Sequence, residues 1–120
     1  MTLQEFYNTI DESFDAVMNR LRKEDRIAKY LGFFLSDPSF SELEKAFEIN
    51  NPEAAFRAAH TMKGVASNLG FDKLAQESSN LTEDLRPLSF TGNSKILFSN
   101  VKSTYSKIVG HIKAFQSSQV

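Results

Sequence analysis

Apolar side chains recur every three or four residues along almost the whole chain, and few residues interrupt this spacing. The 120 residues include only five Gly and three Pro. Spacing of three and four places side chains on one face of a helix, and a scarcity of helix breakers argues against a fold of many short strands. The sequence therefore predicts an all-α protein. In the last helical stretch the apolar stripe comprises Leu97, Val101, Tyr105, Ile108, Ile112 and Phe115.

Proline and glycine mark the ends of the central helices. Asn51 is a capping side chain followed by Pro52 at the first helical position, which is a strong start signal. Gly70 can adopt the left-handed conformation that ends a helix. Asp37-Pro38 indicates a new start or a kink. The main helices are expected at residues 24–36, 38–50, 52–69, 71–86 and 94–116.

Capping signals also occur nearer the N-terminus. Thr2 and Glu5 have the spacing of a capping box, and Ser41 and Glu44 repeat it. Asp11 is placed to cap a further short helix. We expect an antiparallel four-helix bundle with additional short N-terminal helices, forming a single domain over residues 1–120.

Composition excludes several classes of function. The chain has 14 basic and 15 acidic residues without a basic stripe, so nucleic acid is a poor partner. The absence of Cys rules out disulfides and thiolate metal sites. The N-terminus lacks the features of a signal peptide, and no window approaches the roughly 20 apolar residues that span a bilayer. We expect a soluble, cytoplasmic monomer that binds no membrane.

The segment around His60 combines an apolar face with a reactive one. At about 100° per residue, His60 lies roughly 140° from the centre of the apolar side, and points mostly to solvent. Lys63, Gly64 and Ser67 fall on its side of the helix, and Phe56 lies one turn before it. The apolar side, which must face the core, comprises Ala55, Ala59, Met62, Ala66 and Leu69.

These residue types suit phosphoryl transfer. A neutral imidazole is a good nitrogen nucleophile near neutral pH. Lys63, one turn from His60, could offset the charge of a phosphohistidine, and Gly64 leaves room for a phosphate or a partner. Ser67 could donate one further hydrogen bond. No carboxylate cluster here could hold Mg²⁺, so a metal and an acceptor Asp would come from the partner.

The string His60-Thr61-Met62-Lys63-Gly64 resembles the signature of histidine phosphotransfer (HPt) domains, a His followed by two residues, Lys and Gly. Met62 stands where Leu is common in that family. The similarity covers roughly residues 24–112. Further matching positions are Asp37, Leu43, Ala46, Ala54, Ala55, Phe56, Ala66, Asn68, Leu69 and Gly70.

The resemblance implies that His60 carries the phosphoryl group and that Lys63 and Gly64 support it. The expected partners are receiver domains of response regulators or of hybrid histidine kinases, with no cofactor on this chain and Mg²⁺ on the receiver. Because the pattern begins near Met1 and fills the chain, a free-standing carrier is expected. Thr82, with Ser78 or Ser79 behind it, is the candidate on the following helix to meet the histidine. The remaining candidate partner or phosphate contacts are Phe56, Arg57, Thr61, Ser67 and Asn68.

Two alternatives compete with the carrier interpretation. The same bundle could be an adaptor that binds signalling partners without being phosphorylated. His60 could also be the general base of an enzyme, although that role needs an orienting carboxylate and a pocket. Glu53, Asp72 and Glu77 have no spacing that points at His60. His111 is interpreted as an ordinary surface residue because no Lys-Gly pair follows it.

Overall fold

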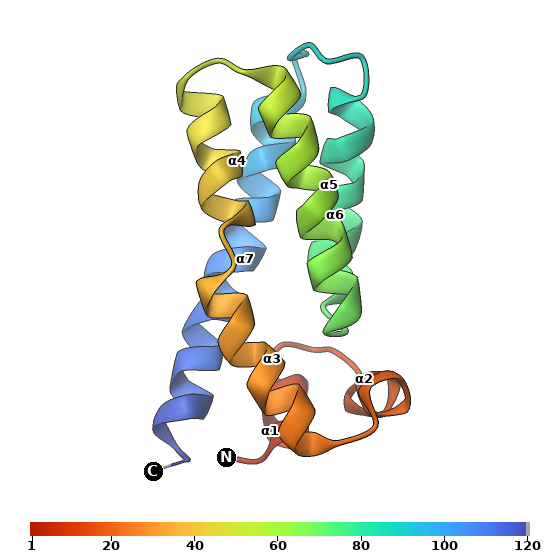
Figure 1. Ribbon diagram of the computed structural model, residues 1–120, viewed down its shortest axis with the longest axis vertical. Helices are drawn as coiled ribbons and strands as arrows, with labels where there is room; N and C mark the ends of the chain where they lie inside the picture. Colours follow the sequence, from red (N-terminus) through yellow and green to blue (C-terminus); the bar gives the residue numbers. More distant parts are fainter. Residues whose placement is uncertain (120) are drawn as a thin grey trace.

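The computed structural model describes residues 1–119, which form seven helices and no strand (Figure 1). The prediction of an all-α protein is confirmed. No helix within these residues combines the length and apolar character needed to cross a bilayer. The helices are α1 (Leu3–Thr9), α2 (Phe14–Leu21), α3 (Glu24–Ser36), α4 (Ser39–Glu48), α5 (Pro52–Asn68), α6 (Asp72–Leu85) and α7 (Ser94–Ser117).

Helices α4, α5 and α6 lie side by side with the first half of α7, and the chain reverses direction at each connection (Figure 1). Helix α7 continues past them and packs against α3 and α1. The result is an elongated molecule of 43 × 25 × 19 Å. The predicted boundaries of the five main helices are confirmed to within two residues.

The inward face of α5 consists mainly of small side chains. Ala55, Ala59 and Ala66 are fully buried, and Met62 is buried between them. Alanine adds little bulk, so neighbouring helices can approach α5 closely, and α5 packs against both α4 and α6. This packing fixes which face of α5 remains at the surface.

Helices α1 and α2, with the turn that joins them (residues 3–21), form an N-terminal cover beneath the α5–α6 turn (Figure 1). Its Phe6 and Tyr7 are fully buried and pack their rings against Phe71. Three hydrogen bonds fasten the cover: Tyr7 Oη donates to the Leu69 carbonyl at 2.6 Å, Arg20 Nη1 donates to the Ser67 carbonyl, and the Lys73 N–H donates to Glu12 Oε2 at 3.0 Å.

One N-terminal capping signal is confirmed and another is wrong. Thr2 and Glu5 form both hydrogen bonds of a capping box at the start of α1. Asp11, however, does not cap α2; it lies in the turn with a φ of 59°. The cap is Ser13, whose hydroxyl accepts from the Ala16 N–H at 3.1 Å.

The capping box predicted at Ser41 and Glu44 is also wrong. Helix α4 begins two residues earlier, at Ser39, so Ser41 lies in its first turn and donates to the Pro38 carbonyl. Asp37 Oδ1 accepts from the Ser39 N–H at 2.8 Å. Asp37-Pro38 is thus a break between two helices, because the aspartate binds the free N–H at the start of the second.

Candidate functional site

Helix α5 is regular and unbroken through His60, as predicted. Its N-terminus is capped by Asn51, whose side-chain oxygen accepts from the Ala54 N–H at 3.1 Å, with Pro52 in the first turn. Gly70 follows its end with a φ of 74°, in the predicted left-handed conformation. His60 is exposed in mid-helix, while Ala59 is buried, so the predicted orientation of this helix is confirmed.

Lys63 and Gly64 are both exposed one turn beyond His60. A Cβ built on Gly64 meets no atom within 4 Å, so internal packing does not require glycine there. Glycine in mid-helix costs about 1 kcal/mol relative to alanine. The missing side chain therefore leaves open space outside the protein, beside the imidazole.

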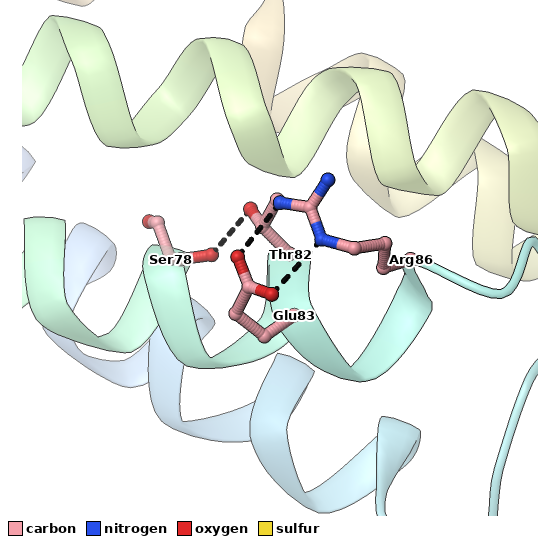
Figure 2. A network of polar contacts seen from close by, with 4 residues as sticks. All are labelled: Ser78, Thr82, Glu83 and Arg86. Atoms are coloured by element: carbon pink, nitrogen blue, oxygen red, sulfur yellow. Dashed lines mark hydrogen bonds and ion pairs between the residues drawn. The ribbon is translucent and has the colours of Figure 1, made fainter.

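Helix α6 brings a charged pair to the same edge of α5. Arg86 binds Glu83 through two hydrogen bonds, Nη2 to Oε1 at 2.7 Å and Nε to Oε2 at 2.9 Å (Figure 2). The guanidinium carbon also lies 5.4 Å from the ring centroid of Phe56. Because Phe56 lies one turn before His60, this cation–π contact connects the end of α6 to the face that carries the histidine.

The Glu83 carboxyl is influenced by charges on both α6 and α5. The hydrogen bond from Arg86 is the main cause that lowers the pKa of the Glu83 carboxyl. The positive charges of Arg86 and Lys63 also lower it. Glu83 therefore experiences positive charge from α5 as well as from Arg86.

Thr82 is buried, and its hydroxyl donates to the Ser78 carbonyl within α6 at 2.7 Å (Figure 2). Ser78 is also buried, with a side-chain oxygen that has no partner among residues 1–119, and Ser79 is partly buried. A contact between Thr82 and His60 stays a prediction. The α6 charges placed toward the histidine face are those of Glu83 and Arg86.

The other predicted contact residues lie at the surface, on α5 or at its end. Ser67 is exposed, and its carbonyl accepts from Arg20. Thr61 is exposed and donates back to the Arg57 carbonyl at 3.0 Å. Asn68 lines a shallow cavity of about 230 Å³ on the α3 side. Arg57, Thr61, Ser67 and Asn68 are thus all exposed, and their roles in binding, like that of Phe56, stay predictions.

Sequence reasoning missed Glu83 and Arg86. Both are charged residues at the end of α6, three positions apart, which is the spacing of an ion pair on a helix. That spacing was a usable signal. The spacing does not indicate that Glu83 and Arg86 approach the histidine face, because this approach depends on how α6 packs against α5.

A model of the Hpt domain family matches residues 36–95, which is half of the chain. The chain belongs to the Hpt domain family. The matched region contains α4, α5 and α6, and with them His60, Lys63 and Gly64. Hpt domains are phosphotransfer carriers of phosphorelays and generally not enzymes. Searches of curated proteins and of solved structures returned no match.

Proposed function

We propose that this Hpt domain carries a phosphoryl group on His60 and exchanges it with an aspartate of receiver domains. One observation supports the proposal most strongly. His60 is exposed in the middle of a regular helix, beside Lys63 and an unobstructed Gly64, within the region matched by the family. An imidazole at such a position can approach a phosphoaspartate on another protein.

The transfer step needs only a neutral imidazole. The lone pair of one ring nitrogen of His60 attacks the phosphorus of the receiver's aspartyl phosphate. The N–P bond forms as the bond from phosphorus to the carboxylate oxygen breaks, and the aspartate leaves as a carboxylate. The proton on the other ring nitrogen stays in place during the step, and solvent can accept it afterwards. The reverse sequence returns the phosphoryl group.

Lys63 and Gly64 assist this step in different ways. The Lys63 ammonium offsets the charge on the transferred oxygens, an interaction that strengthens as the phosphoryl group arrives. Gly64 keeps the surface beside His60 low, so a receiver domain can bring its aspartate to the ring. Neither residue forms or breaks a covalent bond.

Mg²⁺ and the acceptor aspartate would be supplied by the partner. Within residues 1–119, no three acidic or imidazole side chains come together as a metal site. The proposed partners are receiver domains of response regulators or of hybrid histidine kinases. We propose further that residues 1–120 act as a single domain and a monomer, that α4 to α7 serve as an antiparallel four-helix bundle, and that the relay operates in the cytoplasm.

An adaptor that is never phosphorylated is the second candidate. It would use the same exposed surface of α5 for binding, and it would not need a nucleophile there. A general-base role for His60 has less support. Both oxygens of Glu83, the carboxylate that approaches this face, are bound to Arg86. The shallow cavity beside α5 is lined by Val65 and Asn68 and does not include His60.

A transfer assay with two matched variants tests the proposal. His60→Gln and His111→Gln each remove one of the two histidines, and His111 lies on α7, outside the site. Purified wild-type chain and both variants are incubated with a phosphorylated receiver domain and Mg²⁺. We expect wild type and His111→Gln to gain a base-stable, acid-labile phosphate and His60→Gln to gain none. Equal labelling of His60→Gln would contradict the proposal, and binding of the receiver without labelling of any chain would favour the adaptor.

A further inference from the structure

The ion pair between Glu83 and Arg86 is well formed but exposed. Both of its hydrogen bonds are short, yet the side chains of Arg86 and Glu83 are 57% and 60% exposed. Exposed ion pairs contribute little to stability, typically below about 1 kcal/mol. A stronger anion close to Arg86 could therefore displace Glu83 at little cost.

A phosphoryl group on His60 would be such an anion. Phe56, which carries the Arg86 guanidinium over its ring, precedes His60 by four residues, or about 6 Å along the helix axis. Lys63 follows His60 by three residues, or about 4.5 Å. The imidazole thus has Lys63 one turn after it on α5 and the contact between Phe56 and Arg86 one turn before it. Arginine suits a phosphoryl group well, because its planar guanidinium can bind two oxygens at once.

Glu83, unlike Arg86, is expected to disfavour a phosphoryl group on His60. While His60 is unmodified, the Glu83 carboxylate is neutralised by Arg86 and lies within the field of Lys63. A phosphoryl group would add negative charge to the same surface. Glu83 would then repel that group and compete with it for Arg86.

We propose that Glu83 and Arg86 form an exchangeable pair in which Arg86 moves from Glu83 to the phosphoryl group when His60 is phosphorylated. This inference rests on the proposed function and assigns positioning roles to two residues outside the His60-Lys63-Gly64 motif. Arg86 stabilises the phosphorylated state, whereas Glu83 stabilises the unphosphorylated state by holding Arg86. The pair therefore sets how the phosphoryl group divides between this chain and a receiver domain.

The exchange can be observed directly on the arginine. Wild-type chain labelled with ¹⁵N-arginine is phosphorylated with phosphoramidate, and the Nε–H signal of Arg86, assigned by its absence in Arg86→Lys, is followed by NMR. We expect this signal to shift on phosphorylation, while those of Arg22 and Arg26, which lie outside α5 and α6, stay within a line width. A phosphohistidine at His60 with an unmoved Arg86 signal would overturn the exchange and leave the proposed function standing. Absence of any phosphohistidine would instead contradict the proposed function.

The phosphoryl-transfer equilibrium provides a second test with opposite signs for the two residues. With a receiver domain that exchanges phosphoryl groups with wild type, Glu83→Gln should move the equilibrium toward phospho-His60 about three- to tenfold. Arg86→Ala should move it toward the receiver by a similar factor. A general loss of structure could not produce these opposite shifts, and circular dichroism of each variant checks the fold.

The matched control is a second exposed ion pair, in which Lys102 binds Glu44 at 2.9 Å between α7 and α4. Lys102→Ala removes a surface cation of the same kind from helices that do not carry His60. We expect its equilibrium to equal that of wild type within twofold. If Glu83→Gln and Arg86→Ala shift the equilibrium no further than this control, or shift it in the same direction, the inference is wrong.

Discussion

The N-terminal cover and the histidine face of α5 are built from different kinds of contact. The cover is held by fully buried aromatic rings and by hydrogen bonds to the α5–α6 turn, at Leu69 and Lys73 among others. The histidine face consists of exposed side chains whose few partners are also exposed. The N-terminal cover contributes to stability because its side chains are packed. The histidine face can accept a ligand because its side chains are exposed.

This difference separates stability from chemistry along one helix. The cover binds the last turn of α5 and the first turn of α6, whereas His60 lies two turns earlier in α5. The matched family region begins at residue 36, after the cover has ended. Substitutions in the cover should therefore change the free energy of unfolding, and substitutions on the histidine face should change phosphoryl transfer.

The largest expected effect is on stability, from Phe6→Ala in the cover. Phe6 is fully buried and contacts the rings of Tyr7, Phe71 and Phe115. Truncation of a buried Phe to Ala costs about 3–5 kcal/mol. Urea denaturation should show this loss, and the folded variant at low temperature should still accept a phosphoryl group at the wild-type rate. A loss of acceptance by fully folded protein would mean that the cover takes part in the chemistry.

Lys63→Ala should show the reverse pattern. It removes the cation one turn after His60 while the nucleophile remains. Charge-assisted hydrogen bonds contribute about 1.5–3 kcal/mol, so transfer should slow roughly ten- to a hundredfold if the contact forms in the transition state. Stopped-flow or quench-flow transfer rates measure the effect. The free energy of unfolding from urea titrations should stay within about 0.5 kcal/mol of wild type. An unchanged rate would remove Lys63 from the proposed mechanism.

Gly64 within α5 and Gly70 just after it sharpen the comparison. Gly64→Ala adds a methyl group where no atom lies within 4 Å, so stability should rise by up to about 1 kcal/mol. Gly70→Ala should destabilise by about 1 kcal/mol or more, because its φ is +74° and a Cβ would lie 3.3 Å from Val17 Cβ. Thermal unfolding of both variants should show a gain of stability for Gly64→Ala and a loss for Gly70→Ala.

Gly64→Gln should additionally weaken receiver binding, which calorimetry with the unphosphorylated chain measures. An unaltered affinity would contradict a steric role for Gly64.

The smallest effects are expected at Glu12, which accepts from the Lys73 N–H in the first turn of α6. Loss of such a cap in Glu12→Ala should cost about 1 kcal/mol. Glu12→Gln keeps an acceptor oxygen, so its stability should differ by less than about 0.5 kcal/mol.

The pH dependence at Glu12 has a defined sign. Burial is the main cause that raises the pKa of this carboxyl. The folded state then holds the proton more tightly than the unfolded state, so this group destabilises the fold as pH rises through its raised pKa. The stability of wild type relative to Glu12→Gln should therefore be higher at pH 4 than at pH 7 in urea titrations. The opposite trend would contradict the assigned burial.

Local patterns predicted the helices and the orientation of α5, because caps and apolar spacing act within a few residues. Asn51, Gly70 and the alanine face are examples in which the local signal and the structure agree. The errors arose where a neighbouring residue provided the cap in place of the predicted one. Asp11 lies in a turn while Ser13 caps α2, and Asp37 binds the first N–H of α4.

The candidate site was predicted only in part for a similar reason. His60, Lys63 and Gly64 lie on one helix, so their arrangement follows from helical geometry alone. Glu83 and Arg86 reach that face from α6, through an ion pair and a contact with Phe56 that depend on helix packing. A capping residue as distant as Glu12 for α6 is invisible to local patterns in the same way.

The most direct test of the account is to locate the phosphoryl group on the chain. Wild-type protein phosphorylated by a receiver domain is digested at neutral pH, and the peptides are mapped by mass spectrometry. The account predicts one phosphoryl group per chain, on His60, in the peptide between Arg57 and Lys63. A phosphoryl group on His111, on a hydroxyl side chain or on no residue of a receiver-bound chain would contradict it.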